Sequence, residues 1–444
     1  MKTPLTLRQV RIALVVIAVL QAVWFGLALQ QAAPMPWGDT HDYQFIADEL
    51  AQGHFGVIWN FYRPPGYPLL IFLSQALGIK STVAVVVFNR AAAVLAVAVL
   101  PGAAGVGIGV GYLLMCSYST VVSYENFLMS EGPMPGFLLV AWLLGLLAYR
   151  AVQKRRYEAA TVLLVGQLIW VASLKPAFKA YPVLELGILG MFCAMALPRI
   201  ARRDVKRVGL NVAALLAFTV LINGVVFRSS GGLPMVQNKA ITLVHVLPQL
   251  TAGEVALMSP KLQETYGVYH KLLANGPVEM NGVPVPYEDG AQLFDYLIVP
   301  HFPTFLGLYV RKMLSLVYYS SWNQNFGNID MRIGIPRGFG SLGMLLTTCV
   351  VGALLALGLG SKVVPDLAAL TQVGGCAAYG FAVQMFVAAN DDARISMMWV
   401  PAYFVFLVQL WWLGWTRARS LARSWPSAAR KARKRSSPTG EPTS

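Results

Sequence analysis

Long apolar segments recur along almost the whole chain, and they limit its fold more than any other feature of the sequence. A helix rises 1.5 Å per residue, so about 20 apolar residues cross the ~30 Å hydrocarbon core of a bilayer. No strand-like alternation of apolar and polar residues competes with these segments. Because the chain is 56% hydrophobic and only 12% charged, it cannot keep its surface in water. We therefore predict an all-α polytopic membrane protein.

The apolar segments predict about ten transmembrane helices. They lie near residues 12–29, 82–100, 101–117, 133–149, 158–174, 180–197, 208–226, 341–359, 367–388 and 396–415. Basic clusters at residues 2–11, 150–156 and 199–207 flank these segments, and Lys and Arg are enriched on the cytoplasmic side of a membrane. The formal net charge of +15 is therefore an orientation signal. The expected surroundings are membrane lipids, and no nucleic-acid partner is predicted.

Alternation of the spans places two long loops, besides short turns, on the extracytoplasmic side of the cell (inner) membrane, and both termini in the cytoplasm. These are the first outer loop, residues 30–81, and the long outer loop, residues 228–340. Residues 1–416 then form one transmembrane module. The remaining tail, residues 417–444, is basic and rich in Ser and Pro, a composition that predicts disorder.

Residues 301–322 allow two interpretations. The segment is apolar enough for an eleventh span, but Arg311 and Lys312 stand in its middle, where a charge costs roughly 2.5 to 3.5 kcal/mol even on the insertion scale. An amphipathic helix lying in the outer interface keeps both charges in water. We therefore favour an interfacial helix here, as in the first outer loop.

The sequence WGDTHDYQFIADEL in the first outer loop predicts a helix with one apolar face. Its apolar residues follow the spacing i, i+3, i+4 and i+7: Tyr43, Ile46, Ala47 and Leu50. Asp39 stands just before this helix. It is either only the N-cap, accepting a hydrogen bond from a free backbone N–H, or a fixed base or ligand at the bilayer surface. Asp42 lies on the same face, where the two carboxylates would share a metal ion or a substrate hydroxyl.

The motif RPPGYP, residues 63–68, predicts a rigidly mounted arginine at the start of the next helix. Pro64 and Pro65 restrict the backbone after Arg63, so its side chain is not carried by a flexible chain. A guanidinium binds phosphate oxygens in pairs and stays charged at every physiological pH. The alternative is a proline-rich turn whose arginine only contacts lipid headgroups.

These first-loop residues resemble a known family. The resemblance rests on Asp39, Tyr43, Ala47, Leu50, Gly53 and the sequence RPPGYPLL. They are similar to the first-loop signature of GT-C glycosyltransferases that use polyprenyl-phosphate sugars, a group that includes protein O-mannosyltransferases and the lipid A aminoarabinose transferase. The resemblance is strongest over residues 37–75. It implies a GT-C fold in which Asp39 is the catalytic or metal-associated carboxylate and Arg63 contacts the donor phosphate.

The chain also departs from this family pattern. Many relatives carry Asp-Glu at the loop acid, whereas this chain has Asp39 and Thr40, with Asp42 as the second carboxylate. A divalent metal ion held by Asp39 and Asp42 is therefore an open alternative and not a requirement. The large soluble carboxy-terminal domain of some relatives is missing, so acceptor recognition is expected to fall to residues 228–340.

Further polar residues are candidates on the same side of the membrane. Lys175 and Arg394 are predicted second contacts to the donor phosphate, although anchors at helix ends are an equally good explanation. Arg90 and Glu185 fall inside predicted spans, where a charge needs a partner, so they pair with each other or Arg90 faces the phosphate. The candidate substrate-binding residues are Asp42, Tyr43, Tyr67 and Glu131.

Together these features predict a membrane glycosyltransferase. It would transfer a monosaccharide from a polyprenyl-phosphate donor to a hydroxyl of an acceptor lipid, glycan or protein at the extracytoplasmic face, with inversion. Asp39 is the predicted base, and the predicted donor phosphate ligands are Arg63, Lys175, Arg394 and Arg90. Two alternatives stay open. A flippase or transporter of a lipid-linked sugar would use the same contacts without a base, and a subunit of an envelope-polysaccharide assembly would be non-catalytic.

Overall fold

The structure is a computed structural model of the chain. It describes residues 7–34, 36, 40–60, 63–100, 102–116, 125–126, 128–174, 202–225, 236, 239–240, 242–274, 286–318, 372–380, 402–403 and 405–410. Within these residues all regular secondary structure is helical. The predicted all-α class is confirmed for this part of the chain.

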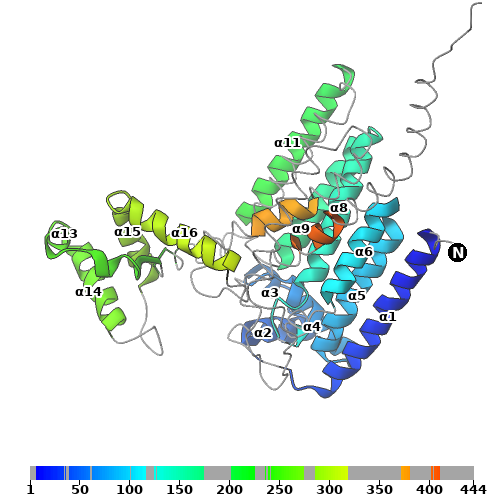
Figure 1. The fold of residues 1–444 in the computed structure, drawn as a ribbon, viewed down its shortest axis with the longest axis horizontal. Coiled ribbons are helices and arrows are strands. Elements are labelled where there is room, and N and C mark those ends of the chain that lie inside the picture. Colours follow the sequence, from blue (N-terminus) through cyan, green and yellow to red (C-terminus); the bar gives the residue numbers. More distant parts are fainter. Residues whose placement is uncertain are drawn as a thin grey trace, which may run out of the picture.

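The main body is a bundle of helices that lie side by side (Figure 1). They are α1 (Leu7–Gln31), α5 (Ser81–Val99), α6 (Gly102–Cys116), α8 (Met134–Gln153), α9 (Tyr157–Leu174) and α11 (Arg202–Val225). Helix α1 packs on α5, α5 on α8, α8 on α9, and α9 on α11. Near the start of α1 the Arg11 guanidinium donates to the Leu100 carbonyl, just past the end of α5, over 2.5 Å. The helices α1 and α5 are therefore antiparallel.

Within the described residues four helices are long and apolar enough to cross a membrane, namely α1, α5, α8 and α9. A fifth candidate is the pair α15 (Tyr287–Ile298) and α16 (Phe302–Tyr318), which meet at a 109° bend. These helices support the predicted multi-pass character. The count of about ten spans stays a prediction, because residues 180–197 and 341–359 lie outside the described chain and residues 367–388 and 396–415 are described only in part. The predicted tail, residues 417–444, also lies outside it.

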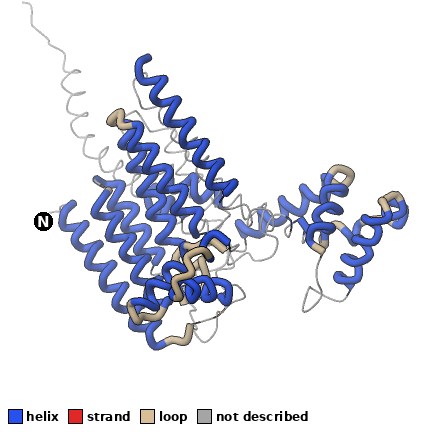
Figure 2. The backbone as a smooth tube through the Cα atoms, turned by 180° about the vertical axis from the view of Figure 1, so that it is seen from behind, coloured by secondary structure: helices blue, strands red, loops and turns tan. Residues whose placement is uncertain are grey.

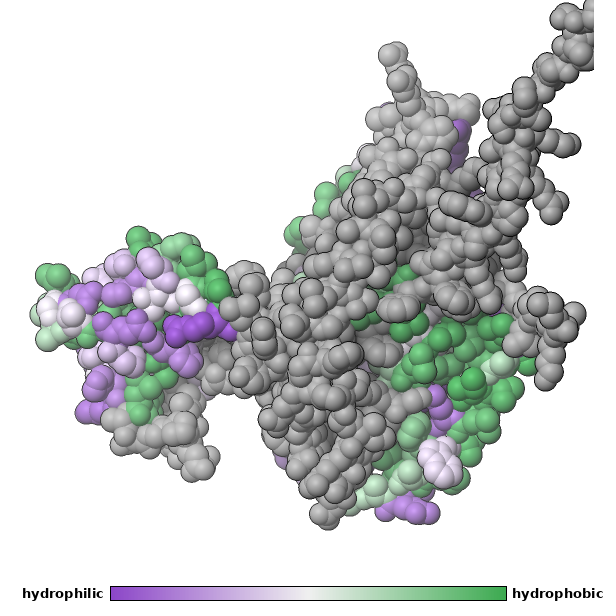
Figure 3. Space-filling view, viewed as in Figure 1, coloured by the Kyte–Doolittle hydropathy of each residue, from purple (hydrophilic) through white to green (hydrophobic). Residues whose placement is uncertain are grey.

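One face of α1 is apolar and unpacked. Leu20, Trp24 and Leu27 are 62%, 74% and 61% exposed, and Figure 3 shows apolar residues gathered on this flank of the molecule. Such a long apolar face is unfavourable in water and suits contact with lipid acyl chains. The exposure of α1 is the second structural observation, after helix length, that fits a membrane protein.

Helix α5 lies at the centre of the bundle and packs against α1, α4, α6 and α8. Its side chains there are small, and Ala93 and Ala96 are fully buried. Small residues let helix backbones approach closely, which replaces the missing hydrophobic drive between helices in lipid. Gly136 of α8 makes a close approach to α5: a Cβ on Gly136 would lie 2.6 Å from both the Asn89 Oδ1 and the Phe88 ring.

Short helices fill the connection between α1 and α5. They are α2 (Thr40–Ala51), α3 (Val57–Asn60) and α4 (Gly66–Ala76), and α2 packs on α4 while α4 packs on α5 and α9. The predicted helix with a Tyr43 to Leu50 stripe is confirmed as α2. All four stripe residues are buried, and so is Thr40.

Residues 239–240, 242–274 and 286–318 form a second unit, which we call the helical lobe. It contains η2 (Leu247–Gln249), α13 (Ala252–Ala256), α14 (Pro260–Ala274), α15 and α16. The lobe has its own core, in which Leu243, Tyr269, Leu293 and Phe305 are buried. The segment predicted as a long hydrophilic loop is thus a folded unit in its described part. The predicted helix from residue 301 is confirmed as α16, whereas its place on a membrane surface stays a prediction.

The close approach of α8 to α5 predicts a specific sensitivity. Gly136→Ala should destabilise the protein by about 1 to 3 kcal/mol, because the added methyl overpacks the contact with Phe88 and Asn89. The measurement is the thermal midpoint in detergent. Gly166→Ala in α9 is the matched control, because no atom lies within 4 Å of a Cβ there. Equal midpoints for the two variants would contradict the packing described for Gly136.

Candidate functional site

The candidate site lies where the α1–α5 connection meets the connection between α6 and α8. Figure 2 shows the turns of this region gathered at one end of the bundle. The first residue of α2 joins the two connections, because the buried Thr40 hydroxyl donates to the Leu128 carbonyl over 3.0 Å. On the same side the Asn126 amide donates to the Ala33 carbonyl over 3.2 Å. The start of α2 is therefore fixed by the α6–α8 connection.

Two buried tyrosines, Tyr43 of α2 and Tyr67 of α4, form the base of the site. The Tyr43 hydroxyl donates to the Ser130 Oγ over 3.2 Å, and the Ser130 hydroxyl donates to the Glu131 carboxylate over 3.1 Å. The Tyr43 and Tyr67 rings meet edge to face, with centroids 5.2 Å apart, a favourable geometry for aromatic pairs. Burial, with the nearby Tyr43 and Glu131, raises the pKa of Tyr67 well above its ordinary value. Tyr67 therefore keeps its hydroxyl proton.

The predicted arginine mount is seen at the start of α4. Helix α4 begins at Gly66, directly after Pro64 and Pro65, where the first-turn N–H groups have no helical partner and proline is tolerated. The Arg63 Nε donates to the Asp42 carboxylate over 3.0 Å. The Arg63 guanidinium also lies 5.7 Å from the centre of the Tyr43 ring, within the range of a cation–π contact. Arg63 is thus held by both an acid and an aromatic ring of α2.

Gly66 sets how closely α4 approaches the end of α9. A Cβ on Gly66 would lie 2.7 Å from the Ser173 carbonyl oxygen, so only glycine fits without a backbone shift. Ser173 stands two residues before Lys175 in the sequence. Lys175 itself, a predicted phosphate contact, lies outside the described residues.

The predicted substrate-binding residues divide into two groups. The Asp42 and Arg63 side chains keep 23% and 25% of their surface exposed. Tyr43, Tyr67 and Glu131 are 3%, 0% and 1% exposed. These three side chains form the packed base of the site, and their predicted contact with substrate stays a prediction. Among the predicted residues in the described chain, Asp42 and Arg63 form its accessible part.

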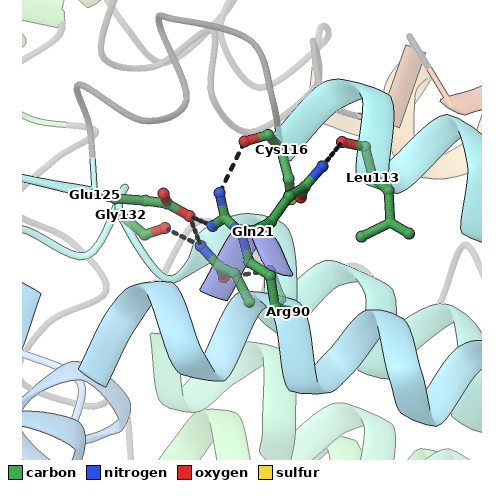
Figure 4. Close-up of polar contacts among 8 residues, drawn as sticks. Gln21, Arg90, Leu113, Cys116, Glu125 and Gly132 are labelled. Atoms are coloured by element: carbon green, nitrogen blue, oxygen red, sulfur yellow. Dashed lines mark hydrogen bonds and ion pairs between the residues drawn. The ribbon is translucent and has the colours of Figure 1, made fainter. Parts of the chain in front are cut away.

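Arg90 has a partner that the sequence did not predict. The sequence placed its guanidinium opposite Glu185 or the donor phosphate, but the structure pairs it with Glu125. Figure 4 shows both side chains pointing toward each other inside the bundle, with a second Arg90 nitrogen donating to the Cys116 carbonyl over 2.8 Å. Arg90 is 1% exposed and Glu125 is fully buried. Arg90 thus has an acid and a backbone carbonyl as partners inside the bundle, and its predicted contact with the donor phosphate stays a prediction.

Arg90 also donates a hydrogen bond to a backbone carbonyl of α6. Arg90 is near the middle of α5, and α6 ends beside it at Cys116. The last carbonyls of a helix have no partner within the helix. Here Gln21 of α1 donates to the Leu113 carbonyl over 3.2 Å (Figure 4), and Arg90 donates to that of Cys116.

Three predicted residues lie outside the described chain. They are Asp39, Lys175 and Arg394. Asp39 directly precedes Thr40 in the sequence, and the Thr40 hydroxyl donates to the Leu128 carbonyl. The described residues contain no group of three or more His, Cys, Asp or Glu side chains arranged to hold a metal ion. Because Asp39 is not among them, the Asp39 and Asp42 metal site stays a prediction.

Sequence reasoning missed the role of the α6–α8 connection. Glu131 was a candidate substrate-binding residue, and it is buried together with Glu125, Asn126 and Ser130. The signal was the Asn89–Arg90 doublet inside an apolar run, since two polar residues within a span require buried partners. The sequence alone did not show that the partners come from the next connection.

The arrangement is suited to holding an anion beside a fixed acid. Arg63 is a permanent cation on a rigid mount, and Asp42 orients its Nε. A guanidinium positioned in this way binds phosphate or carboxylate groups with defined geometry. The helix α2 presents its N-terminus at the same place, which favours negative charge.

Comparisons with protein-family models, with curated proteins and with solved structures find no match to this chain. The similarity of the first-loop residues to GT-C glycosyltransferases therefore remains a prediction. The function has to be argued from the chemistry of the site.

The Tyr67 hydroxyl yields a prediction about stability. It is buried and has no hydrogen-bond partner among the described residues, so Tyr67→Phe should not destabilise the protein and should stabilise it by up to about 1 kcal/mol. Tyr43→Phe is the contrast, because it removes the bond to Ser130 and should cost about 1 kcal/mol. Thermal unfolding in detergent measures both. A loss of stability in Tyr67→Phe as large as in Tyr43→Phe would contradict the unpaired state of the Tyr67 hydroxyl.

Proposed function

We propose that the chain is a glycosyltransferase of the cell (inner) membrane that uses a polyprenyl-phosphate sugar as donor. It transfers the sugar to a hydroxyl of an envelope lipid, glycan or protein on the extracytoplasmic side, with both termini in the cytoplasm. The observation that carries the proposal is the Arg63 mount. Arg63 is held against Asp42 at the start of α2, and Asp39 directly precedes that helix.

The proposed roles follow from charge. The donor contains a phosphate whose negative charge grows as the bond to the anomeric carbon breaks. A fixed guanidinium stabilises that charge without reorganising, which is the most effective form of electrostatic catalysis. Arg63 is partly exposed and rigidly mounted, as this role requires. Lys175 and Arg394 stay candidates for further phosphate contacts.

The proposed reaction is a single displacement. The acceptor hydroxyl oxygen bonds to the anomeric carbon, and the bond from that carbon to the phosphate oxygen breaks. Asp39 takes the hydroxyl proton, and the polyprenyl phosphate leaves with the bonding electron pair. One displacement inverts the anomeric configuration, and a carboxylate base is a suitable group for this step, as in glycoside hydrolysis. A divalent cation at Asp39 and Asp42 would stabilise the charge on the phosphate, but the displacement does not require it.

The bundle and the helical lobe suggest a division of work. The bundle has an apolar flank for lipid at α1, which fits a donor carried on a polyprenyl chain. The lobe has its own core and a front surface on which polar and apolar residues are mixed (Figure 3), which fits recognition of an acceptor. We therefore assign the donor to the bundle and the acceptor to the lobe.

The base makes the sharpest test. Asp39→Asn should lower the rate of glycosyl transfer by about 10²- to 10⁴-fold, the typical contribution of a general base, while donor binding is retained. Asp48→Asn is the matched control, because Asp48 lies at the far end of α2 and contacts only the exposed Gln75 in the described structure. The measurement is transfer of radiolabel from carrier-linked sugars to membrane acceptors. A flippase would keep moving its lipid in Asp39→Asn, and that result would overturn the proposal.

The phosphate contact is tested separately. Arg63→Ala should weaken donor binding by about 10- to 100-fold, since a hydrogen bond to a charged group contributes roughly 1.5 to 3 kcal/mol. Arg63→Lys should lie between the wild type and Arg63→Ala, because lysine keeps the charge but lacks the planar fork. Arg207→Ala is the control, because it removes a guanidinium from the exposed pair with Glu158 on α9. Unchanged donor affinity in Arg63→Ala would favour a non-catalytic subunit or a lipid-headgroup anchor.

A further inference from the structure

We propose that the buried Arg90–Glu125 pair, together with Asn89, positions the candidate site from inside the bundle. The pair fixes the α6–α8 connection, and that connection fixes the start of α2. Only the catalytic consequence of this inference rests on the proposed function. The mechanical link between the two groups of contacts does not depend on any substrate.

The inner end of the link is a group of contacts on α5. Asn89 donates to the Glu125 carboxylate over 2.7 Å and to the Gly132 carbonyl over 3.0 Å. Its own amide oxygen accepts the Gly136 N–H over 3.0 Å. Arg90 adds the ion pair to Glu125. Figure 4 shows Glu125 and Gly132 beside Arg90. Residues 125 and 132, at the two ends of the described segment 125–126 and 128–132, are thus both bonded to α5.

The outer end of the link is the contact of the same segment with α2. Leu128 accepts the Thr40 hydroxyl, and Ser130 accepts the Tyr43 hydroxyl. Both contacts lie between the two held ends, within five residues of Glu125. A shift of the segment would therefore move Thr40 and Tyr43. Because Asp42 stands between them in α2, it would also change the position of the Asp42–Arg63 pair.

The strength of the link comes from burial of charge. Arg90 and Glu125 are almost completely removed from solvent, and a buried ion without its partner is strongly unfavourable. A buried ion pair with added hydrogen bonds is favourable only in a narrow range of geometries, so it restricts small shifts of the segment. The Cys116 carbonyl restricts the Arg90 guanidinium further. Arg90, Asn89 and Glu125 are thus positioning residues.

The test measures the link without any substrate. Met129 is buried in the held segment, and Met129→Cys places a thiol there for labelling by a hydrophilic maleimide in detergent. In the Glu125→Gln background this introduced thiol should react at least about tenfold faster, because an unpaired buried charge favours local opening. Ala141→Cys, on a fully buried position of α8, is the control and should keep its rate. Protein with the native cysteines only gives the background.

A second variant guards against a folding defect in Glu125→Gln. Asn89→Ala removes the bonds to Glu125, Gly132 and Gly136 but leaves the ion pair, so labelling at position 129 should rise by a smaller factor, about threefold. Two results would overturn the inference. One is an unchanged labelling rate at position 129 in both variants. The other is an equal rise at positions 129 and 141, which would indicate general loosening of the bundle.

The catalytic consequence is measured on the same proteins. Glu125→Gln should lower kcat for transfer more than it changes the donor KM, because the acid and the phosphate contact lose their relative geometry while Arg63 is retained. If labelling at position 129 rises and no variant, wild type included, transfers a sugar, the positioning inference holds and the proposed function fails. If transfer is normal in Glu125→Gln, the positioning inference fails and the proposed function stands.

Discussion

A polar group inside an apolar bundle must find its partner within the chain, and this constraint shapes the protein from α5 outward. Asn89 and Arg90 lie in the middle of a helix whose other buried residues are mostly alanine and valine. Water cannot satisfy them there. Their partners are the end of α6 and the inward-folded connection after it. The same contacts that remove an energetic cost therefore define the path of the chain between α6 and α8.

The candidate site follows from this path. Helix α2 lies on a surface built by residues 128 and 130 and by the Tyr67 ring of α4. Helix α4 in turn approaches the end of α9 as closely as Gly66 allows. The accessible pair of Arg63 and Asp42 thus lies on elements that contact residues 128 and 130, the Tyr67 ring and the end of α9. Such preorganisation matters for a site that must stabilise developing charge, because loose ligands would have to be ordered during the reaction.

Much of the local structure could be predicted from the sequence. The stripe from Tyr43 to Leu50 predicted α2 and its buried face, and the prolines after Arg63 predicted the start of α4. These features are encoded by neighbouring residues. The partner of Arg90 was not predicted, because pairing between residues 35 positions apart depends on how the connection folds. The burial of Tyr67 and Glu131 was missed for the same reason, and the folded lobe was hidden by its low hydrophobicity.

The helical lobe has a core that shares no residue with the core of the bundle. Substitutions inside one core therefore change the stability of that unit with little effect on the other, as expected for sites that share no contacts. A lineage of such proteins is free to diversify the lobe while the α2–α4 region stays constant. Under the proposed function, descendants would then differ in the acceptor that they modify and agree in how they bind the donor.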